Sequence, residues 1–219
     1  MRSTHSLVLA TLAFILPLAP DALGAQGANP AHAHIGHLAD AFRGTPEGKG
    51  LIPTAIAEAN VVAQHAALAA RDPNDLDAAK THAGHIMHAI DPASAERGPG
   101  LGYGLKPAVT AALNHAGLAA RSEGASQNVA NHTGHITASL TNTSQRADRI
   151  AELAKGIQAA ASAADAAPLV TELNTVASQL VPGVDANGDG RVGWQENEGG
   201  LQQAEQHVGL LKTAEGITE

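Results

Sequence analysis

Residues 65–71 read H-A-A-L-A-A-R, and residues 115–121, fifty positions further on, read H-A-G-L-A-A-R. A second stretch, H-A-G-H-I at 82–86, recurs at the same offset as H-T-G-H-I. Between residues 48–86 and 98–136, thirteen of thirty-nine positions are identical without a gap. Chance similarity among alanine-rich helices explains repeated alanines but not repeated histidines. We therefore infer an internal duplication, and H-I-G-H-L-A-D at 34–40 resembles H-I-M-H-A-I-D at 85–91, as a fragment of a third copy would.

Each repeat has the pattern of a helical hairpin. Apolar residues recur at spacings of three and four through Ile56, Val62 and Leu68, as on one face of an amphipathic helix. Turn-forming residues interrupt the pattern at D-P-N-D (72–75) in the first repeat and at S-E-G-A (122–125) in the second. Two antiparallel hairpins form a four-helix bundle. We therefore predict an all-α fold, with an additional N-terminal helix at 32–42, a last repeat helix reaching Ala160 and a further helix at 168–181.

The N-terminal segment has the features of a secretory signal. An apolar run from Leu7 to Ala19 follows Arg2, and small residues stand near Gly24 and Ala25. The run is short for a membrane span, so a removable signal at 1–25 is favoured over a retained anchor. We predict export to the periplasm or to the outside of the cell. Two further regions are predicted, a His-rich duplicated bundle at 26–165 and a calcium-binding segment at 166–219.

Composition excludes several classes of protein. The chain has no cysteine, so it forms no disulfides, no thiolate metal site and no c-type haem attachment. Aromatic residues make up 2%, and a core of alanine, leucine, valine and isoleucine favours helices. The net charge is −8, of which residues 166–219 carry −6 (eight acids, two bases). No basic patch indicates a nucleic-acid partner, and no basic amphipathic helix indicates membrane binding after signal removal.

The histidines of the repeats are spaced as metal ligands. His82 and His85 are three residues apart, so both point to one face of a helix, and His65 is level with them across the turn. The same reasoning groups His115 with His132 and His135. Three imidazoles without thiolate suit Zn²⁺, Cu²⁺ or Ni²⁺. We therefore predict a three-histidine transition-metal site in each hairpin.

Other histidines lie outside these two predicted groupings. Asp91 and His88 are candidates to complete a metal shell. His32, His34 and His37 form a looser cluster that joins one of the two sites or acts alone. His207 stands alone on the last helix and is expected to be a surface residue. The alternative for all of them is a half-buried packing position that binds nothing. The six predicted ligands are His65, His82, His85, His115, His132 and His135.

Residues 185–196, D-A-N-G-D-G-R-V-G-W-Q-E, fill every ligand position of a calcium loop. Side-chain oxygens stand at Asp185, Asn187, Asp189 and Glu196, and Arg191 offers its carbonyl. Gly190 permits the sharp turn at position 6. This pattern resembles the EF-hand family over about thirty residues, which implies a helix–loop–helix that binds Ca²⁺. The alternative is a turn rich in Asp, Asn and Gly that binds nothing.

Two departures from that family favour a structural calcium clip over a signalling switch. Pro182 and Gly183 break the helix that should enter the loop, and Gly199 and Gly200 interrupt the helix that should leave it. No second loop of this kind occurs in the sequence. The His-rich part also resembles, in style only, the small exported metal-binding proteins built of alanine- and histidine-rich helices.

The sequence thus predicts an exported metal-binding protein that buffers, carries or senses a transition metal, with an unknown protein partner. A b-type haem or electron-transfer bundle is the alternative with a cofactor, and it predicts a Soret band. A calcium-stabilised interaction protein is the alternative without a transition metal. A di-iron centre is disfavoured because no Glu-x-x-His occurs. No enzyme is predicted, since no Gly-x-Ser-x-Gly and no cysteine nucleophile occur.

Overall fold

A computed structural model of the protein describes residues 29–95 and 97–218, and the predicted signal segment lies outside this range. The described residues form helices joined by loops, which confirms the predicted all-α bundle. The helices are α1 (Pro30–Ala39), α2 (Leu51–Ala69), α3 (Leu76–Ile90), α4 (Leu105–Arg121), α5 (Gln127–Ala159), α6 (Ala163–Ser178) and α7 (Leu201–Glu215), with 3₁₀ turns η1 (Pro46–Gly48) and η2 (Pro92–Ser94).

The helix ends follow the turn signals in the sequence. The α2–α3 loop contains D-P-N-D, and the Asp75 carboxylate caps α3 by accepting a hydrogen bond from the Ala78 amide at 2.9 Å. The α4–α5 loop contains S-E-G-A, and the Ser126 hydroxyl caps α5 by accepting from the Val129 amide at 3.1 Å. Such caps satisfy amide groups that have no partner within the helix.

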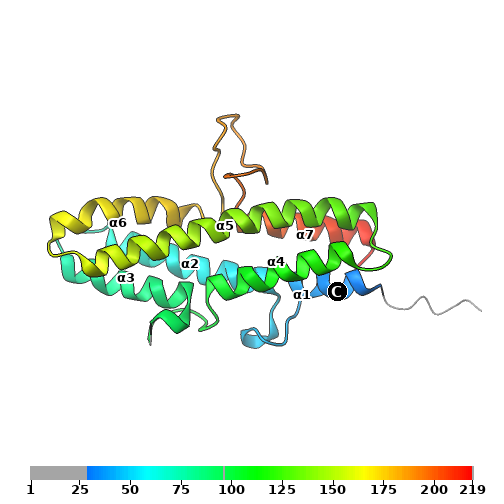
Figure 1. Ribbon diagram of the computed structural model, residues 1–219, viewed down its shortest axis with the longest axis horizontal. Helices are drawn as coiled ribbons and strands as arrows, with labels where there is room; N and C mark the ends of the chain where they lie inside the picture. The colour runs from blue at the N-terminus through cyan, green and yellow to red at the C-terminus, as the bar shows by residue number, and fades with distance from the viewer. Residues whose placement is uncertain (1–28, 96, 219) are drawn as a thin grey trace, which may run out of the picture.

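The longest helix, α5, sets the shape of the molecule (Figure 1). It has 33 residues, which corresponds to about 50 Å at 1.5 Å per residue. Helices α6 and α7 have 16 and 15 residues and lie one after the other along it. Helix α3 contacts α5 and α6, whereas α1 contacts α4 and α7. The bundle is therefore elongated, with different helices around each half of α5.

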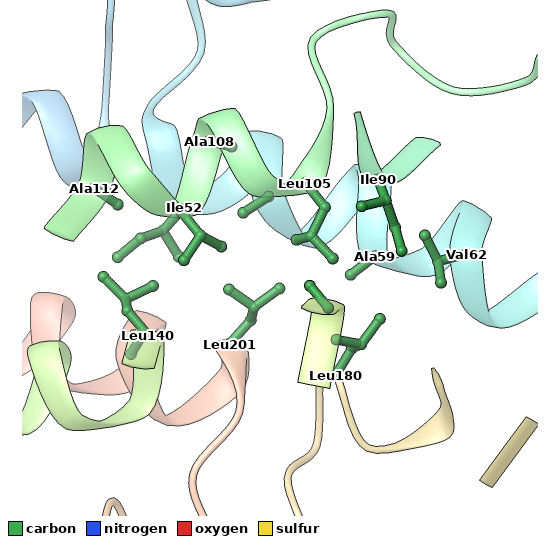
Figure 2. Close-up of a cluster of buried hydrophobic side chains, with 14 of the residues drawn as sticks. Ile52, Ala59, Val62, Ile90, Leu105, Ala108, Ala112, Leu140, Leu180 and Leu201 are labelled. Carbon is green, nitrogen blue, oxygen red and sulfur yellow. The ribbon is translucent and has the colours of Figure 1, made fainter. Parts of the chain in front are cut away.

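The two halves share one apolar core, part of which is drawn in Figure 2. Ile52 of α2, Leu105 of α4 and Leu140 of α5 are at most 1% exposed. Leu180 and Leu201, which belong to the C-terminal segment, are fully buried beside them. Burying one such side chain stabilises the fold by roughly 1.5–3 kcal/mol. The last two helices are thus held by the same core as the His-rich helices.

Residues 182–200, here called the excursion, leave the bundle after α6 and return at the start of α7 (Figure 1). The two ends of the excursion lie side by side and form a neck, which is closed by the Leu201 amide donating to the Leu180 carbonyl at 3.0 Å. Gly183 has φ +77°, and a Cβ on Gly200 would lie 2.6 Å from the Gly183 nitrogen, so the neck requires both glycines.

The excursion departs from the predicted helix–loop–helix. Helix α6 ends at Ser178, well before Asp185, and α7 begins only at Leu201, beyond Glu196. The helices that should flank the calcium loop are therefore not continuous with it. The break was expected from the sequence: Pro182 has no amide for a helical hydrogen bond, Gly183 adopts the left-handed region at φ +77°, and Gly200 is extended.

No helix within the described residues is both long and apolar enough to span a membrane.

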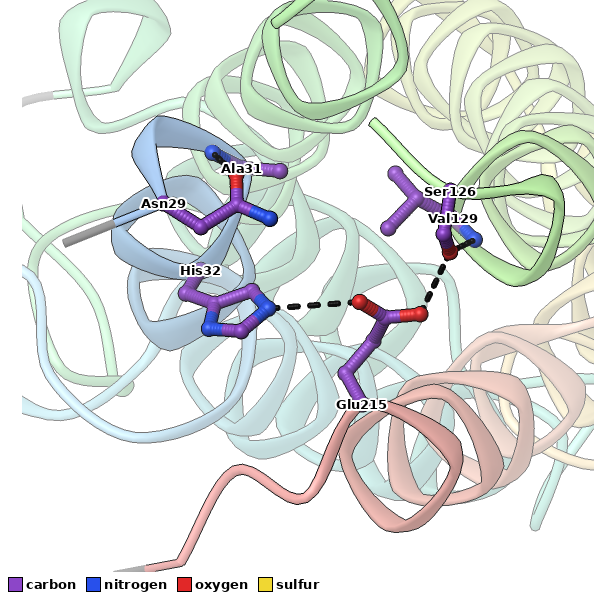
Figure 3. A network of polar contacts seen from close by, with 6 residues as sticks. All are labelled: Asn29, Ala31, His32, Ser126, Val129 and Glu215. Carbon is purple, nitrogen blue, oxygen red and sulfur yellow. Dashed lines mark hydrogen bonds and ion pairs between the residues drawn. The ribbon is translucent and has the colours of Figure 1, made fainter. Parts of the chain in front are cut away.

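A polar network joins the first and last helices (Figure 3). The His32 imidazole of α1 has its Nε2 3.3 Å from a carboxylate oxygen of Glu215 at the end of α7. The Ser126 hydroxyl, at the start of α5, donates to the other oxygen of that carboxylate. This hydrogen bond, and secondly the His32 imidazole, lowers the pKa of the Glu215 carboxyl below its usual value.

Because its pKa is lowered in the folded state, Glu215 contributes stability that is present above about pH 4.5 and is lost as the pH falls through the folded pKa. We expect Glu215→Gln to unfold at lower urea concentration than the parent at pH 7, with the difference shrinking at pH 3. Glu205→Gln, at an exposed position of the same helix, is the matched control and should change neither value. A Glu215→Gln deficit of equal size at both pH values would contradict this assignment.

Candidate metal sites

Nine histidines gather in three groups, each with its ligand nitrogens within 4.8 Å of one another. In every group two histidines of one helix meet a single histidine of another. The Nδ1 atom of the single histidine lies 2.9–3.1 Å from the Nδ1 atom of the first histidine of the pair and 3.3–3.4 Å from the Nδ1 atom of the second. Site A is His34 and His37 of α1 with His115 of α4, site B is His82 and His85 of α3 with His65 of α2, and site C is His132 and His135 of α5 with His207 of α7.

The same local packing positions the imidazoles in all three sites. Around His65, the residues three before, one after and four after are buried, namely Val62, Ala66 and Ala69. In every site, the residues at these three offsets are buried around the single histidine and around the first histidine of the pair. The imidazole therefore starts at the edge of an apolar helical stripe. It is half-buried, and its Nδ1 faces the neighbouring helix.

Short sequence repeats accompany this packing, and the pattern of each half-site occurs three times, with His34 corresponding to His82 and not, as expected, to His85. The paired histidines lie in H-x-G-H followed by Leu or Ile, and the single histidines lie in Gln/Asn-His followed after two residues by Leu. The first pattern occurs at 34–37, 82–85 and 132–135, and the second at 64–68, 114–118 and 206–210.

The nitrogen spacing matches the ligand shell of a transition metal. Two imidazole nitrogens bound at 2.0–2.1 Å to one tetrahedral ion are about 3.3 Å apart. The observed separations of 2.9–3.4 Å bracket this value. A shared proton can bridge only one pair of nitrogens, whereas a cation is shared by three lone pairs. The arrangement is therefore complementary to a cation, and its donors suit Zn²⁺, Cu²⁺ or Ni²⁺.

The surroundings favour the neutral form of several of these imidazoles, which is the form that binds metal. Burial, followed by the charge of the neighbouring histidines, lowers the pKa of His34 and His115 in site A and of His65 in site B. In site C the same causes lower the pKa of His135 and take that of His207 to about 4. Metal ions therefore face little competition from protons at neutral pH.

The structure confirms one predicted grouping and corrects the other. Site B is the predicted hairpin site. The predicted grouping of His115 with His132 and His135 is wrong, because His115 turns to α1 and its Nδ1 lies 2.9 Å from that of His34. Helices α4 and α5 are neighbours as expected. However, equal distance of two residues from the α4–α5 turn determines only their positions along the helix axes, and not which neighbouring helix each side chain faces. Packing of α1 and α7 decides which helix each imidazole faces.

The expectation that His207 is a surface residue is also wrong, because it completes site C with its Nδ1 3.1 Å from that of His132. A signal was present in the sequence, since Q-H-V-G-L at 206–210 matches N-H-A-G-L at 114–118. The alignment at an offset of fifty could not reveal it, because α6 and the excursion separate α7 from its half-site partner.

The remaining candidate ligands have structural roles. His88 has its Nδ1 2.8 Å from the Ala95 carbonyl oxygen, and Asp91 accepts a hydrogen bond from the Ala93 amide at the start of η2. His32 contacts Glu215 instead of joining its neighbours His34 and His37 in site A.

Aromatic side chains contact two of the three sites. Phe42 packs edge-on against His37 and His115 of site A, with ring centroids 5.5 and 5.3 Å apart. Trp194, the only tryptophan of the chain, stacks on His135 of site C at 4.0 Å with an interplanar angle of 18°. These contacts distinguish sites A and C from site B, although the histidines of all three sites are half-buried.

The predicted calcium loop lies at the tip of the excursion and is wound around Asp185. The Asp185 carboxylate accepts hydrogen bonds from the amides of Gly188, Asp189 and Gly190 at 2.7–3.1 Å. Glu196 is exposed on a separate turn. Within the described range, the groups of three or more residues that could hold a metal consist only of histidines. Asn187 and Asp189 also accept from nearby backbone amides, and Arg191 is exposed.

No protein-family model, no curated protein and no solved structure matches the chain.

Proposed function

We propose that the protein binds one transition-metal ion at each of sites A, B and C and acts as an exported buffer, carrier or sensor of that metal. The observation that carries this proposal is the convergence of three Nδ1 atoms, repeated with nearly the same distances in three places. Three copies of one site raise the number of ions held per chain, which serves storage or transport.

Copper is the ion that such donors bind most tightly, although availability decides which metal occupies them in the cell. We propose removal of residues 1–25 on export, and Ca²⁺ binding at residues 185–196. The calcium proposal is supported by the filled ligand pattern and by the loop wound around Asp185. A hard cation such as Ca²⁺ takes carboxylate and carbonyl oxygens, whereas imidazoles take the transition metal, so the two kinds of ion do not compete for the same ligands.

Elemental analysis of untagged protein tests the proposal. After incubation with Cu²⁺ or Zn²⁺ and removal of the excess, we expect three ions per chain, one for each histidine group. The double variant His82→Ala/His85→Ala should lose one of the three because only site B is emptied. His88→Ala is the matched control on the same helix and should keep all three. Retention of no tightly bound metal, or an unchanged number in the double variant, would overturn the proposal.

A further inference from the structure

The excursion contacts site C through Trp194. The indole stacks on the ring of His135, whose Nδ1 lies 3.4 Å from that of His207. Trp194 is nevertheless 38% exposed, so the segment that carries it and not burial in the core holds it there. A change in the excursion therefore reaches a ligand of site C directly.

The stretch of the excursion around Trp194 is docked on the face of α5 that begins at His135. Ser139, Asn142 and Arg146 follow His135 at helical spacing on that face. The Asn142 amide donates to the Gln195 carbonyl at 2.7 Å, and its oxygen accepts from the Asn197 amide at 3.0 Å. These bonds lie on either side of the turn that contains Glu196. The position of Trp194 is thus coupled to that of Glu196.

Glu196 would have to move to complete a calcium site. It occupies position 12 of the loop pattern, but it is exposed, and Asp185, Asp189 and Glu196 are not among the groups of the described residues whose ligand atoms lie within 4.8 Å of one another. A second contact holds the loop in this form, because the buried Glu198 carboxylate accepts from the Gly193 amide at 2.9 Å. Trp194 lies between Gly193 and Glu196. Bringing Glu196 to an ion held by Asp185 and Asp189 therefore moves Trp194 relative to His135.

We propose that Ca²⁺ at residues 185–196 and a transition metal at site C oppose each other through Trp194, so that site C is calcium-sensitive and sites A and B are not. This inference rests on the proposed function. The sequence alone favoured a constitutive clip, and the stacking of Trp194 on a metal ligand changes that expectation. Because coupling free energies are reciprocal, a metal at site C also weakens Ca²⁺ binding by the same factor.

Because Trp194 is the only tryptophan of the chain, its fluorescence reports metal binding at site C without an added label. We expect Cu²⁺ to quench the fluorescence of Trp194 when it binds beside His135, and His207→Ala to remove that quenching. With saturating Ca²⁺, the Cu²⁺ concentration at half-quenching should rise about fivefold or more, which is the lower end of typical coupling between sites. His65→Ala, which empties site B, should leave this shift intact. The variant Asp185→Asn/Asp189→Asn should abolish it.

The outcomes separate the two proposals. If calorimetry shows that Ca²⁺ binds but the Cu²⁺ midpoint is unchanged, the coupling is wrong and the proposed function stands. If no Ca²⁺ binds, the coupling fails together with the calcium proposal alone. Quenching that persists in His207→Ala would count against site C itself. Trp194→Ala, followed by calorimetry, should bind both ions with affinities that no longer depend on each other. Coupling that survives in this variant would exclude Trp194 as its carrier.

Discussion

Loading all three sites should raise the free energy of unfolding by about 8 kcal/mol when the free metal is 100 times its dissociation constant. Each independent site contributes about 2.7 kcal/mol at that ratio, provided that the unfolded chain does not bind the metal. The unfolded chain does not hold the three ligands of a site together, because each site links two helices. Site A joins α1 to α4 and site C joins α5 to α7, with more than seventy residues between the linked ligands. Urea unfolding of metal-free and Zn²⁺-loaded protein measures the difference.

The triple variant His65→Ala/His115→Ala/His207→Ala removes one ligand from each site and is the control. Its unfolding should respond little to Zn²⁺, whereas His207→Ala alone should keep about two thirds of the stabilisation. Hydrogen exchange adds a local readout, because metal at sites A and C should slow exchange in the terminal helices α1 and α7. Equal stabilisation of the parent and the triple variant would show that the metal acts elsewhere.

The contrast between sites B and C shows how far sequence spacing determines a site. His65, His82 and His85 belong to consecutive helices with a short loop, so helical periodicity and equal distance from the turn place them together. Both ligand helices of site B are specified within one stretch of about forty residues. A grouping of this kind can be predicted from the sequence, and the predicted convergence of these three histidines is confirmed, whereas metal binding there stays a prediction.

Sites A and C depend on packing between helices that are distant in the sequence. The height of His115 relative to His132 was predicted from the α4–α5 loop, but the neighbours of each helix were not. Helix α1 packs against α4, and α7 packs against α5. His115 therefore faces the histidines of α1, whereas His132 and His135 face the histidine of α7. That choice depends on how the apolar stripes of seven helices are buried together, which spacing within one hairpin does not contain.

The fold shows the same division. The breaks at D-P-N-D and S-E-G-A and the extension of α5 towards Ala160 are local signals, and they are confirmed. The placement of α6 and α7 one after the other along α5 depends on the length of that helix and on a shared core around Leu180 and Leu201. The neck of the excursion depends both on a local sequence signal and on contacts between distant segments, since the glycines predicted to interrupt helices also allow two chain segments to approach closely.

Arg146→Ala should lower the free energy of unfolding by about 3 kcal/mol and release the excursion from α5. The Arg146 side chain is 8% exposed and donates to the carbonyl oxygens of Asn197, Glu198 and Gly199 at 2.7–2.9 Å. Hydrogen bonds from a charged donor contribute about 1.5–3 kcal/mol each, and they are not additive. Burial lowers the pKa of this guanidinium, so removing it also relieves a cost of desolvation. The net loss is therefore smaller than the sum of three bonds.

Arg149→Ala is the matched control, because Arg149 lies one turn further along α5 and makes only exposed ion pairs with Glu152 and Glu172. Its effect on urea unfolding should be much smaller. Arg146→Lys keeps the charge but loses the planar fork that reaches three carbonyls, so it should resemble the alanine variant more than the parent. In both Arg146 variants the emission of Trp194 should shift to longer wavelength as the indole leaves His135. Unchanged emission would mean that Asn142 and the neck hold the excursion without Arg146.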